Sequence, residues 1–210
     1  MALPSDVKII LGSSSATRQA ILKEMGYDFV VVSADIDERL IRREKPEDLV
    51  MALAEAKAQA ILAKLAASPA TDLSQNSQTT LLITADQVVV HEGNIREKPR
   101  TVEEARIFIE GYSRSPASTV GAVLVTNLTT GATKGGVDRA EIYFHPIPDQ
   151  VISTLIEEGS VFWAAGGLLV EHPLVSPLVD AMVGSIDSVM GLPKDLTTTL
   201  INEALQTNNQ

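Results

Sequence analysis

The chain has 210 residues, a formal net charge of -10 at pH 7 and no cysteine. This acidic charge argues against binding to a nucleic-acid backbone, which requires an excess of lysine and arginine, but a few cations in a cleft can still hold a small phosphorylated ligand. The lack of cysteine excludes disulfides, cysteine-based zinc sites and a thiol nucleophile. With 45% apolar and 21% charged residues, the composition is that of a globular protein with one substantial core or two lobes around a cleft.

No stretch of the sequence predicts export or insertion into a membrane. The first apolar run, residues 7–11, follows no basic region and is too short for the core of a signal peptide. No apolar stretch approaches the roughly 20 residues that cross a bilayer. We therefore expect a cytoplasmic protein without membrane contact.

The first half of the chain predicts alternating strands and helices. Residues 7–11 form a short apolar run that ends at Gly12, which is typical of a buried strand. A helix over residues 16–25 is expected after a serine N-cap, and a second strand is expected over residues 29–32. The longest helical pattern covers residues 46–66, with a proline at its start and acidic residues in its first turn.

The second half begins with a polar, turn-rich segment, residues 68–80, which we interpret as a surface loop. Residues 81–85 then predict a buried strand, which residues 88–91 continue past Asp86. The remaining expected elements are a helix over residues 101–112, a hairpin of strands over residues 118–127 and 133–144, and helices over residues 149–158 and 193–205. Without an internal repeat, this order predicts one α/β domain over residues 1–210, with a mixed β-sheet flanked by helices.

The segment from Gly12 to Arg18 joins the first strand to the first helix and is a candidate phosphate site. Its small residues allow a close approach of the backbone, and a helix N-terminus offers unpaired N–H groups to an anion. Ser13 and Ser15 add hydroxyl groups, and Arg18 adds a charged guanidinium. The alternative is a capped helix whose arginine points to solvent. The segment is not a P-loop, because the closing Lys-Ser or Lys-Thr pair is missing.

Asp86 is a candidate for chemistry because a carboxylate directly after so apolar a run should lie at the carboxyl end of a buried strand. A lone acid there would be costly to desolvate, so either a function or a cationic partner should hold it. The alternative is an aspartate in a turn that accepts hydrogen bonds from its own backbone.

Four further charged residues could serve a phosphorylated ligand, although each alone also fits a solvated surface residue. Lys57 in the long helix and Lys98 before Pro99 could neutralise phosphate. Glu38 could bind a hard cation such as Mg²⁺. Glu171, which follows a glycine-rich segment, could read the edge of a base.

Chemistry based on histidine has little support. His91, His145 and His172 lack the spacing of a metal site. A Ser-His-Asp triad stays open, but the sequence has no G-x-S-x-G motif that would favour it.

These motifs, in this order, resemble the Maf family of nucleotide pyrophosphatases over almost the whole chain. Ser13, Ser15 and Arg18 match the family's S-x-S-P-x-R motif, although Ala16 replaces its proline and Thr17 stands where arginine or tryptophan is common. The later matches are Asp37-Glu38, the A-x-x-K-A helix motif with Lys57, the (S/A)-D-x-V motif with Asp86, Lys98-Pro99, Ala165-Gly166 and the closing V-x-G-L-P motif over residues 189–193. Each motif alone is weak, whereas the ordered series is specific.

The resemblance implies a two-lobed fold with a nucleotide in the cleft, often in a homodimer, and hydrolysis of a nucleoside triphosphate to the monophosphate and pyrophosphate. It also implies Mg²⁺ or Mn²⁺ at Glu38 and Asp86, with Asp86 as the general base on water. Cationic side chains would stabilise charge on the phosphates, and hydroxyl groups would bind the substrate. The residues implied in these two roles are Ser13, Ser15, Arg18, Lys57 and Lys98.

The resemblance also bears on the substrate base, through three variable positions that are here Thr17, Gln87 and Glu171. Gln87 and Glu171 resemble the branch that acts on 7-methyl-GTP, whereas Thr17 matches neither this branch nor the one that acts on dTTP and UTP. The expected substrate is therefore a triphosphate such as 7-methyl-GTP, with dTTP or UTP as the alternative. A third possibility is a nucleotide-binding regulator of cell division without turnover.

Overall fold

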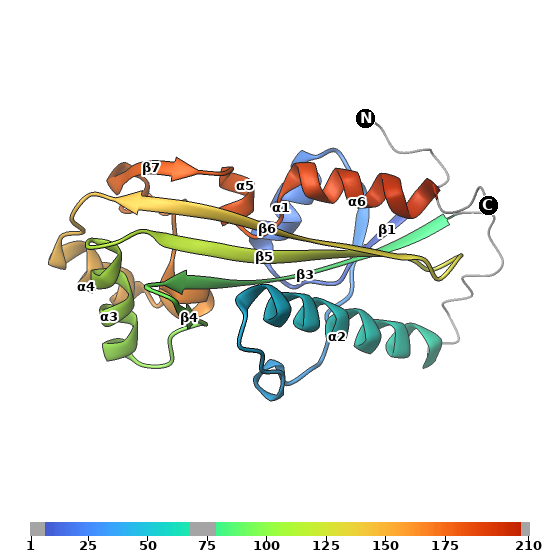
Figure 1. Ribbon diagram of the computed structural model, residues 1–210, viewed down its shortest axis with the longest axis horizontal. Coiled ribbons are helices and arrows are strands. Elements are labelled where there is room, and N and C mark those ends of the chain that lie inside the picture. Colours follow the sequence, from blue (N-terminus) through green and yellow to red (C-terminus); the bar gives the residue numbers. More distant parts are fainter. Residues whose placement is uncertain (1–6, 68–78, 207–210) are drawn as a thin grey trace. The chain divides into compact units, whose positions relative to one another are not determined.

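The computed structural model describes residues 7–67 and 79–206 (Figure 1). The described residues divide into two compact units. Unit 1 contains the described parts of Met1–Asp86, Gly121–Asp138 and Met190–Gln210, and unit 2 contains Gln87–Val120 and Arg139–Val189. The interpretation of residues 1–210 as a single domain stays a prediction.

Strands and helices alternate along much of the chain, as expected. The strands are β1 (Val7–Leu11), β2 (Phe29–Val31), β3 (Thr79–His91), β4 (Asn94–Arg96), β5 (Ala117–Asn127), β6 (Thr133–Phe144) and β7 (Val179–Val183). The α-helices are α1 (Ala16–Glu24), α2 (Pro46–Ala67), α3 (Val102–Tyr112), α4 (Asp149–Glu158), α5 (Ile186–Val189) and α6 (Lys194–Gln206). The short 3₁₀ helices are η1 (Glu38–Leu40), η2 (Ser160–Trp163), η3 (Ala165–Gly167) and η4 (Ser176–Leu178).

The strands form one seven-stranded mixed sheet in the order β2-β1-β3-β5-β6-β7, with β4 paired to β3. β1 is parallel to both of its neighbours, whereas β4 is antiparallel to β3 and β7 is antiparallel to β6. Helices flank the sheet, so the predicted mixed α/β architecture is confirmed. No helix in the described part of the chain is long and apolar enough to span a membrane.

In unit 1, one face of the strands packs against α1 and α6. Ile9 and Leu11 of β1 and Ile83 of β3 belong to the same apolar cluster as Ile21 of α1 and Ile201 of α6. Removing such side chains from water stabilises the fold by about 25 cal/mol per Å² of apolar surface. The alternate residues of each strand point to the opposite face, on which α2 lies (Figure 1).

The packing of α2 on the strands is tight where the candidate phosphate loop begins. A Cβ at Gly12 would lie 2.6 Å from both Ile61 Cδ1 and Thr84 Cγ2, so the neighbours leave room only for glycine. The Thr84 hydroxyl donates to the Ala54 carbonyl oxygen over 2.9 Å, which satisfies a buried polar group on this face. Because Asp86 is two positions after Thr84 on the same strand, its side chain also points toward α2.

The strand that carries Asp86 is longer than the sequence predicted. β3 runs without interruption through Asp86, so the prediction that this residue lies at the carboxyl end of a strand is wrong. The carboxylate is tolerated inside the strand because a cation compensates it, as described below. Thr79 and Thr80 also belong to β3 instead of the expected loop, in keeping with the preference of threonine for strands. The rest of that loop prediction, residues 68–78, lies outside the described residues.

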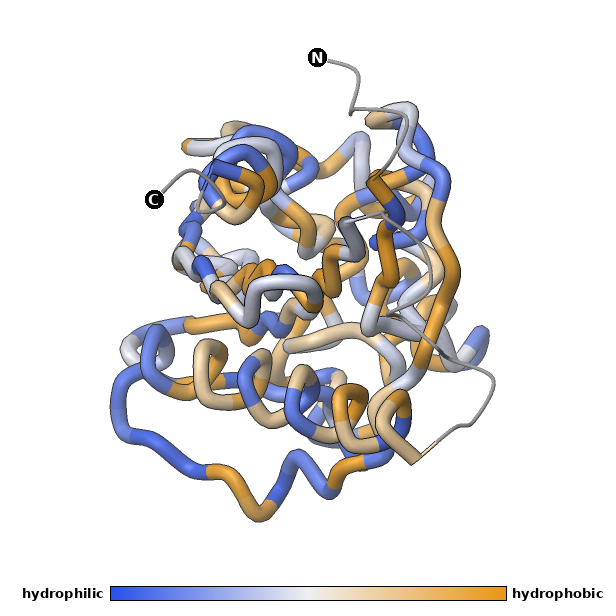
Figure 2. The backbone as a smooth tube through the Cα atoms, turned by 90° about the vertical axis from the view of Figure 1, so that its right-hand side faces the viewer, coloured by the Kyte–Doolittle hydropathy of each residue, from blue (hydrophilic) through white to orange (hydrophobic). Residues whose placement is uncertain are grey.

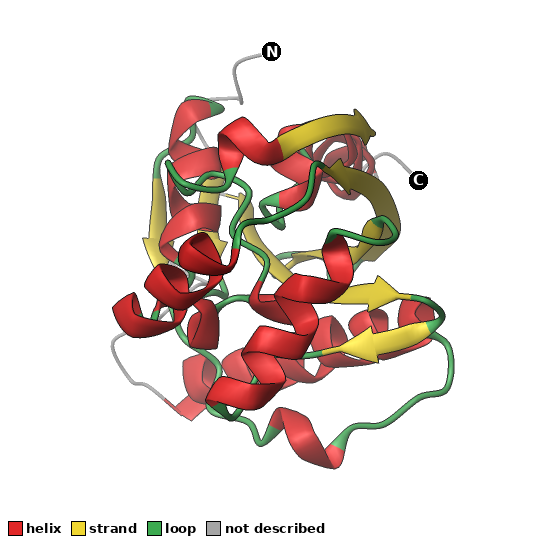
Figure 3. Ribbon diagram, turned by 90° about the vertical axis from the view of Figure 1, so that its left-hand side faces the viewer, coloured by secondary structure: helices red, strands yellow, loops and turns green. Residues whose placement is uncertain are grey.

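Unit 2 contains a group of helical segments that contact one another, namely α3, α4, η2 and η3 (Figure 3). Between α3 and α4, the Arg106 guanidinium donates to Asp149 over 2.5 Å and to Ser153 over 2.9 Å. The edge strand β7 was not predicted from the sequence. None of its residues is fully buried, and it lacks the alternation of buried and exposed residues that is typical of a strand.

His91, the last residue of β3, is buried in unit 2 as a neutral imidazole. Its Nε2 lies 3.0 Å from the Gly111 carbonyl oxygen, which can only accept, so this nitrogen carries the proton. Its Nδ1 has no hydrogen-bond partner within the described residues. Burial, and after it the charge of Arg96, lower the pKa of His91 from its ordinary value of 6.5.

This lowered pKa makes the free energy of unfolding depend on pH. Below about 6.5 the unfolded chain binds a proton at His91 that the folded protein does not bind. The free energy of unfolding should therefore fall as the pH drops through this value, by at most about 1.4 kcal/mol per pH unit, and level off once folded His91 is protonated. Urea unfolding between about pH 5 and 8 measures this slope. In His91→Gln, whose amide can still donate to Gly111, the slope should be smaller, and equal slopes in both proteins would contradict the prediction.

Candidate functional site

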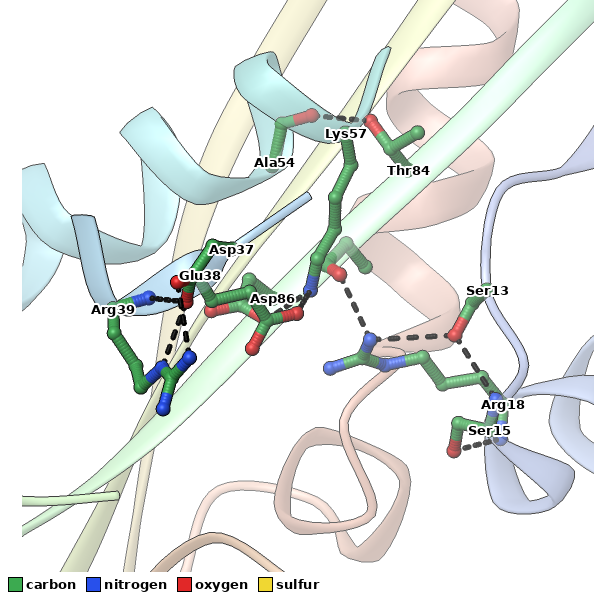
Figure 4. Close-up of polar contacts among 11 residues, drawn as sticks. Ser13, Ser15, Arg18, Asp37, Glu38, Arg39, Ala54, Lys57, Thr84 and Asp86 are labelled. Atoms are coloured by element: carbon green, nitrogen blue, oxygen red, sulfur yellow. Dashed lines mark hydrogen bonds and ion pairs between the residues drawn. The ribbon is translucent and has the colours of Figure 1, made fainter. Parts of the chain in front are cut away.

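The loop between β1 and α1 is shaped by its own serines (Figure 4). The Ser15 N–H donates to Ser13 Oγ over 3.2 Å, and Ser15 Oγ caps α1 by accepting from the Arg18 N–H over 3.4 Å. The predicted serine N-cap is therefore confirmed. In both contacts the hydroxyl oxygen accepts, so each hydroxyl retains the donor role that a phosphate oxygen needs. Thr17 lies in the first turn of α1 and is partly buried.

Arg18 does not point to solvent, as the alternative interpretation required. Its Nη1 donates to the Ala85 carbonyl oxygen over 2.8 Å, and its Nε donates to the Gly191 carbonyl oxygen over 2.9 Å. Burial lowers the pKa of the guanidinium, and the charges of Asp86 and Glu38 oppose this shift. The side chain therefore ties α1 to the peptide that precedes Asp86 and to the glycine of the closing V-x-G-L-P motif.

Lys57 joins the two candidate carboxylates (Figure 4). Its ammonium nitrogen lies 2.5 Å from Asp86 Oδ1 and 2.8 Å from Glu38 Oε1. The side chains of Lys57 and Asp86 are each 11% exposed, whereas that of Glu38 is 42% exposed. Lys57 is therefore no solvated surface lysine, and Asp86 is no turn aspartate, because it lies in a strand and pairs with a cation.

Lys57 and Asp86 are fixed by the packing of α2 and β3, but Glu38 depends on local polar contacts. Residues 32–45, which connect β2 to α2 and run below α2, are mostly hydrophilic (Figure 2). Within them the Arg39 guanidinium donates to both carboxylate oxygens of Asp37, over 2.8 and 3.0 Å, and these bonds lower the pKa of Asp37. Asp37 in turn caps η1, the turn that carries Glu38. Arg39 was not predicted from the sequence, where its only signal is a basic residue directly after the Asp37-Glu38 pair.

Glu38 and Asp86 are suited to hold one divalent cation together. Both carboxylates approach the same ammonium group, so their oxygens lie close enough to share a cation of higher charge. Over residues 7–67 and 79–206, no three or more His, Cys, Asp or Glu side chains form a group that could hold a metal. A cation at this pair would therefore need further ligands, and Mg²⁺ commonly takes these from substrate phosphates and water.

Three predicted residues, Gln87, Lys98 and Glu171, belong to unit 2. Gln87 Nε2 donates to the Ser188 carbonyl oxygen over 2.8 Å, which fixes the amide with Oε1 as the atom that can accept from a ligand. Lys98 is exposed in the connection between β4 and α3, and Glu171 is exposed in the chain after η3.

The predicted residues therefore fall into two sets. Unit 1 gathers Ser13, Ser15, Arg18, Glu38, Lys57 and Asp86, which are linked by the contacts given above. That this set forms one site with the residues of unit 2 stays a prediction.

Comparison with known proteins identifies the family. Residues 8–204 match the family model described as Maf, Maf-like protein. The chain belongs to the Maf family. A 7-methyl-GTP pyrophosphatase of Dictyostelium discoideum is 39% identical to this Maf protein over 198 residues, which cover 94% of this chain and 98% of the relative.

Other relatives of this Maf protein carry two different names. A dTTP/UTP pyrophosphatase of Geotalea uraniireducens (strain Rf4) is 32% identical, with 88% of this chain and 89% of the relative covered. A 7-methyl-GTP pyrophosphatase of Vibrio vulnificus (strain CMCP6) is 29% identical, with 95% and 96% covered. These names agree on cleavage to pyrophosphate and differ in the base.

The pairing of Lys57 with two carboxylates predicts a large effect on stability. Lys57→Met should lower the free energy of unfolding by about 3 kcal/mol, because it leaves a buried carboxylate without its cation. In an Asp86→Asn background the same change should cost about 1–2 kcal/mol less, since one of the two charges is then gone. Urea unfolding of the four proteins measures this coupling.

Lys64→Met is the matched control for this cycle, because Lys64 is an exposed lysine on the same helix, α2. Its effect should stay within about 0.5 kcal/mol. Strictly additive losses for Lys57→Met and Asp86→Asn would show that the ion pair does not stabilise the fold.

Proposed function

We propose that this Maf protein hydrolyses nucleoside triphosphates to the monophosphate and pyrophosphate, with 7-methyl-GTP as its preferred substrate. The names of its relatives support the reaction, and the relative that is 39% identical supports the base. The structural observation that carries the proposal is the meeting of Asp86 and Glu38 at the Lys57 ammonium group. Lys57 and Asp86 are the largely buried members of this cluster, and interacting charged groups in such surroundings are candidates for a functional site.

Asp86 is the proposed general base. One of its oxygens accepts from Lys57, and the carboxylate has a second oxygen that can take a proton from the attacking water. The water oxygen then forms a bond to the α-phosphorus, and the anhydride bond between the α- and β-phosphates breaks. The products are the nucleoside monophosphate and pyrophosphate. Lys57 and Arg18 act by stabilising negative charge that grows on the phosphate oxygens during this step.

Glu38 and Asp86 are the proposed ligands of a divalent cation, Mg²⁺ or Mn²⁺. When bound there, such an ion withdraws charge from the triphosphate. The chain itself fits this role because its two carboxylates already converge on a cation, the ammonium of Lys57. The Ser13 and Ser15 hydroxyls and the Lys98 ammonium supply further donors to the phosphate oxygens.

The proposed choice of base follows from two acceptors. The amide of Gln87 is oriented by Ser188 so that Oε1 accepts, and Glu171 offers a carboxylate. Guanine presents an N1–H and a 2-amino group, a pair of donors that suits such acceptors, and methylation at N7 adds a positive charge that a carboxylate favours. A pyrimidine such as uracil presents only one ring N–H between two carbonyl groups, which makes dTTP or UTP the second candidate.

We also infer a cytoplasmic protein that acts on the free nucleotide and not on a nucleic-acid backbone, in keeping with the charge of -10. A homodimer, as the family resemblance implies, is part of the same proposal.

The role of Asp86 predicts a specific loss of turnover. Asp86→Asn keeps the size of the side chain but removes the base, so pyrophosphate release with Mg²⁺ should fall by about 10²- to 10⁴-fold. Nucleotide binding, measured by calorimetry, should persist. Asp180→Asn, at an exposed position in β7, is the control and should leave turnover unchanged. Hydrolysis by Asp86→Asn at the wild-type rate would remove Asp86 from the mechanism, and no hydrolysis of any triphosphate by the wild-type protein would favour a binding regulator.

The role of Glu171 predicts a change of preference. The wild-type protein should have a higher kcat/KM for 7-methyl-GTP than for dTTP or UTP, and Glu171→Gln should narrow or reverse that ratio. The expected loss for 7-methyl-GTP corresponds to about 1–3 kcal/mol, because the substitution puts an amide donor opposite a donor of the base. Glu157→Gln, at an exposed position of α4, should not change the ratio. A wild-type preference for dTTP or UTP would refute the choice of base and leave the reaction itself standing.

A further inference from the structure

Lys98 is an exposed side chain whose backbone is anchored on both sides. Pro99, directly after it, is buried, and the carbonyl oxygen of Glu97, directly before it, accepts from the Gly166 N–H over 2.9 Å. A Cβ at Gly167 would lie 3.6 Å from Pro99 Cγ, which is ordinary van der Waals contact. The turn formed by Gly166 and Gly167 therefore meets the chain immediately before and immediately after Lys98.

The same turn is held by the hydroxyl of Tyr112. Tyr112, the last residue of α3, is 1% exposed, and its hydroxyl donates to the Gly166 carbonyl oxygen over 2.8 Å. Gly166 has a φ of +61°, and a Cβ there would lie 2.5 Å from the Tyr112 hydroxyl and 2.8 Å from Val89 Cβ. Only glycine allows the backbone at position 166 to lie this close to Tyr112 and Val89. This contact explains why the Ala165-Gly166 motif contains a glycine.

Tyr112 is in turn fixed by its own neighbours. The Arg96 guanidinium carbon lies 5.1 Å from the centroid of the tyrosine ring, and the His91 ring meets it edge-on with the centroids 5.3 Å apart. Burial raises the pKa of Tyr112 to about 12, so the hydroxyl stays a protonated donor at neutral pH. A short chain of contacts thus runs from a rigid phenol through two glycines to the backbone around an exposed lysine.

We propose that Tyr112 is a positioning residue for Lys98. Its hydroxyl holds Gly166, and the Gly166-Gly167 turn holds the backbone that presents the Lys98 ammonium. This inference rests on the proposed function, in which Lys98 neutralises the phosphates of the substrate. A tyrosine with a purely structural role would stabilise the fold, but its effect on hydrolysis would not depend on Lys98.

A double-mutant cycle tests this dependence. Tyr112→Phe removes one hydroxyl and should lower kcat/KM for triphosphate hydrolysis by about 3- to 10-fold, and the loss should vanish when Lys98 is already replaced in Lys98→Gln. Tyr143→Phe removes an exposed hydroxyl that donates to Glu141, so it is the matched control and should leave the kinetics unchanged. Equal losses in the wild-type and Lys98→Gln backgrounds, or no loss in the wild type, would overturn the inference.

The position of the loop can also be observed without turnover. Because the chain has no cysteine, Lys98→Cys provides a single attachment point for a nitroxide spin label. Electron paramagnetic resonance should show a more mobile label when Tyr112→Phe is added and no change when Tyr143→Phe is added. Unchanged mobility with Tyr112→Phe would overturn the positioning role. If Lys98→Gln hydrolyses at the wild-type rate, the proposed role of Lys98 in hydrolysis fails, and the label still reports whether Tyr112 fixes the loop.

Discussion

The ammonium group of Lys57 keeps two carboxylates close together in unit 1. Glu38 and Asp86 come from different elements, and without the cation between them they would repel each other in partly buried surroundings. Arg18 adds a second positive charge in the same unit, bonded to the backbone beside Asp86. These four side chains carry two formal positive and two formal negative charges. In the proposed function, a triphosphate that joins them would need the additional positive charge of a divalent cation.

Periodic apolar patterns predicted most of the fold because burial on one face leaves a clear trace in the sequence. The expected boundaries of α4 and β6 agree with the structure, and those of α2 differ by one residue. The patterns did not predict β7, which has no fully buried residue and depends on its pairing with β6. They also did not predict the turns η2, η3 and η4, which are only three or four residues long. The apolar patterns also did not predict that β3 continues through Asp86, because a polar residue interrupts the apolar run without interrupting the strand.

Residue types predicted the charged groups of the candidate site but not their partners. Asp86 stood out as an acid after an apolar run, yet its cation, Lys57, is 29 positions away and meets it only because α2 packs over β3. Arg18 stood out as a charge near a helix N-terminus. Its bond to Gly191, 173 positions further along, depends on the tertiary path of the chain and has no local signal. Contacts of this kind depend on how the elements pack. The apolar pattern of the sequence predicts which face of an element is buried, but not which distant residues meet it there.

Neither compact unit is a continuous stretch of polypeptide. The first boundary falls between Asp86 and Gln87, within a single strand, and the chain passes between the units again after Val120, Asp138 and Val189. No single deletion can therefore excise one unit and leave the other with intact strands. Recombination between relatives cannot separate the two units cleanly either, because Asp86 of unit 1 and Gln87 of unit 2 are consecutive residues of β3. A ligand preference that depends on Gln87 can change here by point substitution, without the exchange of a whole unit.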